Sequence, residues 1–429
     1  MKKQLTIFLL STITTICAVA QPSAREEIMQ NPDLAASNSA VYPAVTAQQT
    51  PAPHGKKPFY LSHYGRHGSR YLTKIEEYDY VIRILKWADA KDKLTPLGKD
   101  VLRRARLLEK QARNRWGDMT ELGFQQHRDI VRRMTQNYPG IFKGKANIDA
   151  RSTLVPRCVL SMSTALQQLT AINPRLNIHQ DASQHDLHYM NYQDKKLRER
   201  PKDSVAVAKY NEYCRQHQKW DRLMKSLFND TTYIREKVDG ERMNYHLFRL
   251  AGSIQNTTYH GQLTLYDIFT PDEIYHNWLT ANASWYLGFG HAPLTGGEQP
   301  YTQRHLLKKL VEDADSCIRL PKPGAQLRFG HDTMVLPLVC LIDLNGYASA
   351  VGDLDSLPAR GWVDYRVFPM ACNLQFVFYR KNPKDQDVLV KILLNEREAT
   401  LPLDSDSTPY YRWSDVRNYF LRKLNAYQK

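Results

Sequence analysis

Apolar residues recur at helical or strand spacing through most of the chain that follows residue 57. Val101, Leu102, Ala105 and Leu108 fall on one stripe, which predicts that residues 75–135 are mainly helical. Further helices are predicted from Pro156 to Leu169, near 298–316, over the run HDTMVLPLVCLIDL, and near 413–427. Short apolar runs predict strands at Phe59 to Leu61, at NIDARST (147–153), and at 326–330, 373–380 and 388–394.

Strands that alternate with helices indicate an α/β sandwich. Between about residues 184 and 295 the sequence is instead rich in Tyr, Asn, Lys and Arg and has few strand signals, as in an inserted helical domain. A chain of 429 residues is long enough for two lobes. We therefore predict an α/β core formed by residues 58–183 and 296–429, interrupted by a mainly helical cap at 184–295.

The front of the chain has the layout of a cleavable export signal. Two lysines precede an apolar stretch from Leu5 to Ile16, and Ala18-Val19-Ala20 stands before Gln21. We predict a signal peptide at residues 1–20 and a periplasmic or secreted product without a membrane anchor, because the apolar stretch is short for a membrane span. Residues 21–57 are rich in Ala, Pro, Gln and Ser without sustained periodicity, which predicts a surface-lying or flexible arm.

The net charge indicates an anionic partner. The whole chain carries +15 at pH 7, and +13 once the two positive charges of Lys2 and Lys3 are removed with the signal peptide. Such an excess suits nucleic acid, an anionic surface or an anionic small substrate. No nucleic-acid-binding motif accompanies the charge, so a polyanionic small molecule is favoured. Five cysteines follow the signal, an odd number, and Cys340 and Cys372 are predicted to be buried thiols. No sequence feature indicates an oligomeric state.

Three polar clusters lie at the ends of predicted strands: RHGSR after the first, ARST at the second and GHD after a later one. Open α/β sheets bind ligands beyond the carboxyl ends of their strands, so these clusters are expected to meet. Arg66, Arg70 and Arg151 supply planar guanidinium groups that can pair bidentately with phosphoryl oxygens. Gly65 and Gly68 allow the backbone to approach a ligand closely. The sequence therefore predicts a phosphate site.

Within this site, His67 is predicted to be the nucleophile. The positive surroundings favour its neutral imidazole, whose attack on phosphorus would give a phosphohistidine and divide one displacement into two easier steps. His331 can donate to the same oxygens. Asp332 is the expected proton donor to the leaving alcohol, because a nearby phosphate dianion makes it harder to ionise. The histidines show no spacing of a usual ligand set, so neither metal nor cofactor is expected.

Four motifs, RHGSR (66–70), MTELGFQQ (119–126), ARSTLVPR (150–157) and GHDT (330–333), resemble in order and spacing those of the histidine acid phosphatases. This branch of the histidine phosphatase superfamily includes phytases and multiple inositol-polyphosphate phosphatases. The resemblance implies His67 as the phosphorylated nucleophile, a phosphate cradle and Asp332 as acid and then base. The cradle would consist of Arg66, Arg70, Arg151 and His331. It also implies a mixed-sheet, phosphoglycerate mutase-like α/β sandwich with an α-helical cap, and no metal.

Two departures from the family pattern concern detail. Leu72 stands where many relatives have proline. HDT replaces the HAE-type donor of many inositol-polyphosphate phosphatases, which leaves the general chemistry intact and the substrate open.

Several other residues can be interpreted as structural or as functional. Arg157 suits a substrate contact and a surface ion pair about equally. Gly123 and Gln125 are expected to serve helix packing and capping. A charged run such as DKKLRERPK in the cap usually forms a solvated face. In the alternative interpretation, Lys195, Lys196 and Arg198 line the substrate cleft and contact the phosphates that are not being cleaved.

The predicted function is a secreted phosphomonoester hydrolase that acts on inositol polyphosphates such as phytate. The alternative is a broad-specificity acid phosphatase or a glucose-1-phosphatase-like sugar phosphatase. A phosphosugar mutase would use the same nucleophile, but such enzymes work inside cells, so the predicted signal peptide argues against this alternative. A non-catalytic inositol-phosphate binder would be expected to lose His67 or Asp332, and both are present.

Overall fold

The computed structural model describes residues 22–192 and 194–427, so the predicted signal peptide at 1–20 lies outside it. Its centre is an eight-stranded mixed sheet in the order β3-β2-β4-β1-β5-β6-β7, with β8 paired to β6. Strands β3, β2, β4 and β1 run parallel, and the remaining pairings are antiparallel. The strands are β1 Lys57–Arg66, β2 Asn147–Ser152, β3 Asn177–Asp181, β4 Gly324–Gly330, β5 Asn373–Arg380, β6 Leu389–Leu394, β7 Arg397–Ala399 and β8 Tyr410–Arg412.

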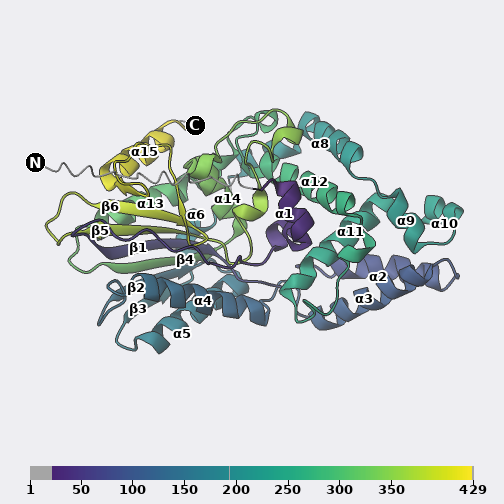
Figure 1. Cartoon of the computed structure of the whole chain (residues 1–429), viewed down its shortest axis with the longest axis horizontal. Coiled ribbons are helices and arrows are strands. Elements are labelled where there is room, and N and C mark those ends of the chain that lie inside the picture. Colours follow the sequence, from purple (N-terminus) through teal and green to yellow (C-terminus); the bar gives the residue numbers. More distant parts are fainter. Residues whose placement is uncertain (1–21, 193, 428–429) are drawn as a thin grey trace, which may run out of the picture.

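Helices cover both faces of this sheet (Figure 1). On β1, Leu61 packs into one apolar cluster with α4 and α5, whereas its neighbour Tyr60 packs into the cluster of the opposite face, because successive strand residues point to opposite sides. The helices of the core are α4 Glu121–Asn137, α5 Pro156–Ile172, α6 Leu187–Met190, α13 Arg304–Cys317, α14 Asp332–Leu341 and α15 Trp413–Asn425. The predicted mixed-sheet α/β sandwich with many helices is confirmed.

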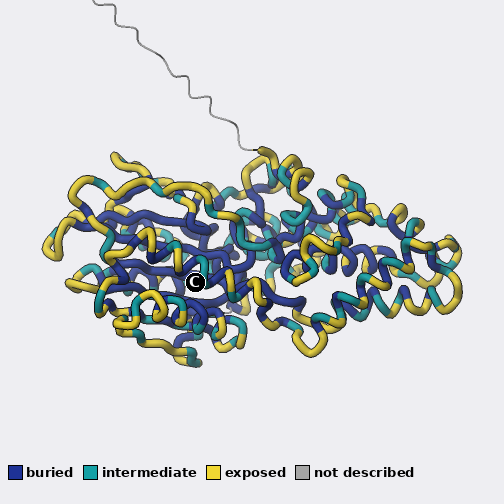
Figure 2. Tube along the Cα trace, turned by 60° about the horizontal axis from the view of Figure 1, so that its bottom comes forward, coloured by how far each residue is buried: buried dark blue, intermediate teal, exposed yellow. Residues whose placement is uncertain are grey.

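A helical lobe extends from one end of the sheet, and Figure 2 shows buried chain running through both parts. It contains α7 Lys195–Glu199, α8 Ser204–His217, α9 Asp221–Leu227, α10 Thr231–Lys237, α11 Gly240–Ser253 and α12 Pro271–Phe289. The helices α2 Glu76–Asp89 and α3 Pro96–Ala112 pack against α11 and α9, so they lie in this lobe rather than on the sheet. Their apolar stripes bury Leu85 and Leu102 in the cluster that holds Leu223 and Leu247. The helical lobe thus draws on residues before the predicted cap at 184–295.

The first part of the segment predicted as a surface-lying or flexible arm, residues 24–39, forms packed helical elements, whereas residues 41–56 have no helix or strand and are mostly exposed. Residues Ala24–Gln30 form α1 and Pro32–Ser39 form the 3₁₀ segment η1. The helix is capped by Ser23, and its residue Ile28 is 1% exposed. In Figure 1 both elements lie between the sheet and the helical lobe, and η1 contacts α11 and α12. The prediction failed here because buried alanines and serines in a 3₁₀ segment give no amphipathic period.

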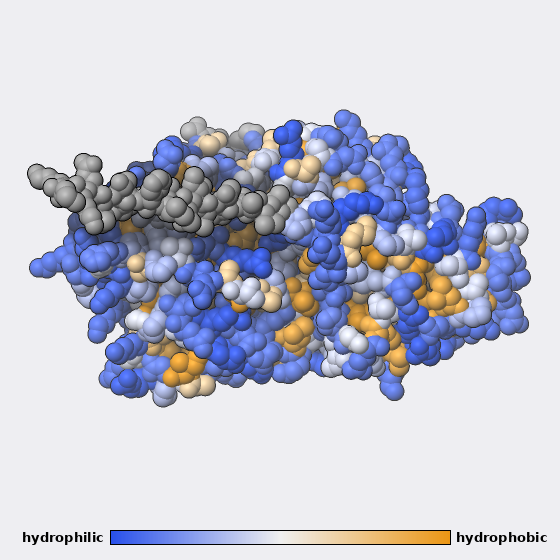
Figure 3. Space-filling model, viewed as in Figure 1, coloured by the Kyte–Doolittle hydropathy of each residue, from blue (hydrophilic) through white to orange (hydrophobic). Residues whose placement is uncertain are grey.

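The surface seen in Figure 3 is mostly hydrophilic, and its apolar patches on the helical lobe are bordered by polar residues. Among the described residues, no helix is both long and apolar enough to cross a membrane. Cys340 and Cys372 are buried and unpaired, as predicted.

Candidate active site

The polar clusters RHGSR and GHD lie together at one edge of the sheet. In the register of the parallel strands β1 and β4, Arg66 stands beside Gly330, so the residues that follow each strand are neighbours. The His67 N–H donates to the Gly330 carbonyl at 3.0 Å, and the Ala371 N–H donates to the His67 carbonyl at 3.0 Å. The loop after β1 is therefore fixed from two sides.

The first turn of α4 holds the next part of this loop. A Cβ atom at Gly68 would lie 2.5 Å from the Gly123 carbonyl oxygen, and one at Gly123 would lie 2.3 Å from the Ser69 carbonyl oxygen. Gln126 accepts from the Ser69 N–H at 2.8 Å. The MTELG motif thus serves packing, as expected of Gly123, whereas Gln125 bonds Asp129 on the exposed face of α4.

His67 is 2% exposed, and its imidazole is held in one tautomer. Nδ1 lies 2.9 Å from the Gly68 carbonyl oxygen. Because a carbonyl only accepts, Nδ1 carries the proton and Nε2 keeps a free lone pair. Burial, followed by the charges of Arg66 and Arg70, lowers the pKa of His67 well below its usual value. The side chain is therefore a neutral imidazole with an unprotonated Nε2.

Three buried or half-buried arginines surround this imidazole: Arg66, Arg70 and Arg157. Arg66 is fully buried, and its Nη1 donates to the carbonyls of Asn38 and Phe368 at 2.7 and 2.8 Å. Burial, followed by Arg66 and Arg157, lowers the pKa of Arg70 to about 9. The Nε atoms of all three arginines are buried without a hydrogen-bond partner among the described residues. Such unsatisfied cationic donors suit an anion with several oxygens.

Asp332 is the anion of this cluster. Its Oδ2 lies 2.9 Å from Arg66 Nη2 and accepts from Asn38 Nδ2 at 3.1 Å, and its Oδ1 accepts from the Thr333 N–H at 2.8 Å. Burial is the largest single influence and raises the pKa of Asp332. The charges of Arg66 and Arg70 and the Asn38 hydrogen bond outweigh it and hold the pKa below its usual value. Asp332 is thus ionised before an anionic ligand neutralises the arginines.

His331 completes the cluster beside Asp332. Its ring centroid lies 5.8 Å from that of His67, and its Nε2 lies 3.2 Å from Thr153 Oγ1. Burial lowers the pKa of His331 to about 4, although Asp332 opposes the shift and Arg157 adds to it. No group of three or more His, Cys, Asp or Glu side chains in the described part of the chain could hold a metal ion.

Arg151, which the sequence predicts as part of the phosphate cradle, is paired with acidic residues on β2 and is not brought into the cluster around His67. On β2 its side chain pairs with Asp149 at 3.0 Å and with Asp186 at 3.4 Å. Strand alternation places Arg151 and Asp149 on the same face, so these groups meet there and away from His67. Arg157, in the first turn of α5, lies with the cluster instead, because its charge acts on His67 and Asp332. The usable signal was its place in the helix turn that follows the strand.

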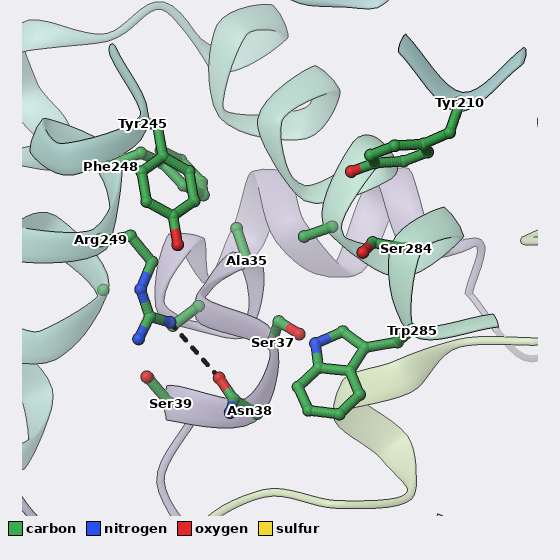
Figure 4. Close-up of a pocket in the computed structure, with 13 residues that line it drawn as sticks. Ala35, Ser37, Asn38, Ser39, Tyr210, Tyr245, Phe248, Arg249, Ser284 and Trp285 are labelled. Carbon is green, nitrogen blue, oxygen red and sulfur yellow. Dashed lines mark hydrogen bonds between the residues drawn. The ribbon is translucent and has the colours of Figure 1, made fainter. Parts of the chain in front are cut away.

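A cavity of about 330 Å³ borders this cluster on the side of the helical lobe. Figure 4 shows Arg249 and Tyr245 on one side, Tyr210 and Trp285 on the other, and Asn38 below. Among the described residues that line it, Arg249 is the one that is charged. The lining is Ala35, Ala36, Ser37, Asn38, Ser39, Tyr210, Tyr245, Phe248, Arg249, Gly252, Ala281, Ser284 and Trp285. Because Asn38 contacts Asp332, the cavity lies next to the carboxylate of the cluster.

Arg198 of α7 approaches the same region from the helical lobe. Its guanidinium lies 5.0 Å from the ring centroid of Phe289, which stacks on Trp285. Its charge acts on Asp332, and its buried Nε has no hydrogen-bond partner among the described residues. The neighbouring Lys195 and Lys196 are exposed. Of these three cations of the basic run, Arg198 thus lies near the cluster, and Lys195 and Lys196 lie at the surface.

Solved structures with similar folds include a multiple inositol polyphosphate phosphatase and phytases. The multiple inositol polyphosphate phosphatase of Bifidobacterium longum, in complex with inositol hexasulfate, matches with a TM-score of 0.73 at 15% identity, over 89% of this chain and 96% of that chain. The phytase of D. castellii matches with a TM-score of 0.65 at 14% identity, over 97% and 90%. The Hafnia alvei phytase with myo-inositol hexakis sulphate matches with a TM-score of 0.51 at 13% identity, over 87% and 98%. No curated protein sequence matches the chain significantly.

A family model matches residues 65–395, which include both clusters that hold His67 and Asp332. Its description is the histidine phosphatase superfamily, branch 2. A match over more than half of the chain, together with the shared fold, identifies the protein as a phosphatase that belongs to branch 2 of the histidine phosphatase superfamily.

Proposed function

We propose that the protein hydrolyses phosphomonoesters through a phosphohistidine at His67. Arg66, Arg70 and Arg157 bind the phosphoryl oxygens, with His331 as a further donor. His67 Nε2 attacks phosphorus, and the bond between phosphorus and the leaving oxygen breaks as Asp332 gives that oxygen a proton. Water then attacks the phosphohistidine, returns a proton to Asp332 and releases phosphate with His67 restored.

One observation carries this proposal. The Gly68 carbonyl accepts a hydrogen bond from the Nδ1–H of His67, so the lone pair of Nε2 is available inside a cluster of buried arginines. A neutral imidazole is a nucleophile, whereas an imidazolium is not. The arginines therefore serve twice, since they keep His67 neutral and stabilise the charge of the transferred phosphoryl group.

The proton that Asp332 gives away comes with the substrate. The arginines keep the free carboxylate ionised, but a bound phosphate cancels much of their field and raises the proton affinity of Asp332. A phosphate monoanion can then pass its proton to Asp332 within the complex. Since the second pKa of a phosphomonoester is about 6, the supply of this proton declines above that pH.

We propose that the substrate is an inositol polyphosphate such as phytate. We also propose that the enzyme is exported. The leaving alcohol departs on the side of Asp332, so its ring would lie in the neighbouring cavity. Arg249 lines that cavity, and Arg198 is close enough to act on Asp332. Both cations could meet phosphates that are not being cleaved, and the excess of positive charge supports an anionic substrate.

A second candidate is a broad acid phosphatase that acts on sugar phosphates. The cavity favours it in one respect, because most of its lining is aromatic, small or hydroxyl-bearing and a single residue is charged. Aromatic faces and hydroxyl groups suit a sugar or polyol ring with few phosphates. Phosphate release from phytate and from glucose 1-phosphate, measured side by side, separates the two candidates.

Replacing Arg157 and Arg151 one at a time tests the cradle. Arg157→Ala should lower kcat/KM for 4-nitrophenyl phosphate by about 10²–10³, the usual effect of removing one donor to a developing anion. Arg151→Ala is the matched control, because it removes an arginine of the same motif that pairs with Asp149 and Asp186. Its kcat/KM should stay within about threefold of wild type. A larger loss for Arg151→Ala would restore Arg151 to the phosphate site.

Replacing Asp332 tests the proton donor. Asp332→Asn should slow hydrolysis of glycerol 2-phosphate by about 10²–10⁴, the contribution of general acid catalysis, and 4-nitrophenyl phosphate far less, because a nitrophenolate leaves without a proton. Wild-type kcat/KM on the alkyl substrate should fall above about pH 6. Equal losses on the two substrates would remove Asp332 from this role.

Neutralising the basic run of the cap tests the substrate. Arg198→Ala should raise KM for phytate several-fold through a lost local contact, while Lys195→Ala/Lys196→Ala should change it less although it removes more charge. If the cap cations acted only by long-range steering, the Lys195→Ala/Lys196→Ala variant would raise KM for phytate more than Arg198→Ala at low salt. Unchanged KM in both variants, or no preference of wild type for phytate over glucose 1-phosphate, would favour the broad phosphatase.

A further inference from the structure

Asn38, from the segment η1, contacts both members of the Arg66–Asp332 ion pair. Its side-chain Nδ2 donates to Asp332 Oδ2 at 3.1 Å, and its backbone carbonyl accepts from Arg66 Nη1 at 2.7 Å. No sequence motif pointed to this residue, which lies 294 positions before Asp332. One residue thus holds the carboxylate and the guanidinium in the same relative position.

The amide of Asn38 has a defined orientation. Arg249 Nη1 donates to Asn38 Oδ1 at 3.4 Å, a long contact that is drawn in Figure 4. Arg249 is itself held by Glu77 at 3.0 Å. Because an arginine only donates, the carbonyl end of the amide faces Arg249 and the NH₂ end faces Asp332. A hydrogen-bonded chain therefore runs from Glu77 of α2 through Arg249 and Asn38 to Asp332.

The backbone around Asn38 is fixed by groups that are themselves buried. Ser37 has φ 55° and ψ −119°, a conformation that is costly for a residue with a side chain. Its hydroxyl donates to Asp364, which is fully buried. On the other side, Asn256 donates to the Ser39 carbonyl at 2.7 Å, and Gln255 accepts from the Val41 N–H at 2.9 Å. Strain next to a site residue, held by buried partners, is typical of functional positions.

The contacts assign different roles to the two carboxylate oxygens of Asp332. Oδ2 accepts a hydrogen bond from Asn38 and lies 2.9 Å from Arg66 Nη2 in an ion pair, so two groups engage it. Oδ1 receives one donor, the Thr333 N–H, and keeps one lone pair. We propose that Asn38 is a positioning residue whose hydrogen bond, together with the ion pair to Arg66, engages Oδ2, so that Oδ1 is the atom that gives the proton to the leaving alcohol and takes it from water.

This inference rests on the proposed role of Asp332 and adds a consequence for pH dependence. Asn38 donates to the ionised form of Asp332, so its loss should raise the proton affinity of Asp332 in the substrate complex and in the phosphoenzyme. Other titratable or charged groups that act on Asp332 are unchanged in the variants below: Arg66, Arg70, Arg157, Arg198, His331, Tyr64, Cys158 and Cys372. A shift in the pH profile would then report Asn38 itself.

Two substitutions and one control test the proposal, with kcat for glycerol 2-phosphate measured across pH. Asn38→Leu removes the donor at similar volume and should move the profile up by about half a pH unit. Asn38→Asp keeps the shape but sets a second carboxylate beside Asp332, so it should move the profile up by about one unit. Asn244→Leu, which breaks the buried amide bond to Asn277 in the helical lobe, should leave the position of the profile unchanged.

Both limbs should move in the same direction, because the acid step needs protonated Asp332 and the water step needs it ionised. Equal fractional losses at every pH in both Asn38 variants, or a shift to lower pH, would overturn the inference. Asn38→Asp preserves shape, so it decides the question if Asn38→Leu does not fold. If Asp332→Asn slows the hydrolysis of alkyl and aryl phosphates equally, the proposed function fails. If Asp332→Asn slows alkyl phosphates more than aryl phosphates, but the pH profiles of the Asn38 variants do not shift, only the role of Asn38 fails.

Discussion

The ion pair between Arg66 and Asp332 is the interaction on which the rest of the site depends. The side chain of Arg66 is fully buried and that of Asp332 is 11% exposed. Removing one partner of such a pair leaves an uncompensated buried charge, at a cost of about 3–5 kcal/mol. Arg66 ends β1, Asp332 begins α14 and Asn38 comes from η1, so three distant segments are held together at this point. The end of β1, the start of α14 and the segment η1 therefore depend on one another for their positions at the site.

The same charges set the chemistry. Burial and the arginines lower the pKa of His67. At Asp332 the arginines and the Asn38 hydrogen bond outweigh burial, which by itself raises the pKa, so the free site holds a neutral imidazole and a carboxylate. The arginines carry more positive charge than Asp332 can balance, and a bound phosphate would supply the missing negative charge. Its arrival weakens the field that kept Asp332 ionised. In the proposed mechanism, substrate binding and protonation of Asp332 are therefore coupled through electrostatics.

The sequence was informative where chemistry follows directly from chain order. RHGSR and GHD each follow a strand, and parallel strands bring their carboxyl ends to one edge, so the juxtaposition of His67 and Asp332 was predictable. The pairing of Arg151 with acidic side chains was not predictable from residue type and motif, because it depends on strand alternation and on its acidic neighbours. Arg157 was left undecided because a lone arginine on a helix looks the same whether it binds substrate or solvent.

Long-range packing accounts for what the sequence did not show. Asn38 lies in a segment of small polar residues without periodicity, and its function depends on contacts with residues far along the chain. The placement of α2 and α3 in the helical lobe has the same origin, since an amphipathic stripe predicts that a helix is covered but not by what.

The most direct test of the account is the chemical identity of the phosphoenzyme. Protein mixed rapidly with labelled 4-nitrophenyl phosphate, quenched in alkali and digested should yield label on the peptide that contains His67, stable in base and lost in acid. The account predicts phosphate on Nε2, because the Gly68 carbonyl holds the proton of Nδ1. Label on another residue, an Nδ1-phosphorylated His67, or wild-type turnover by His67→Ala would contradict it.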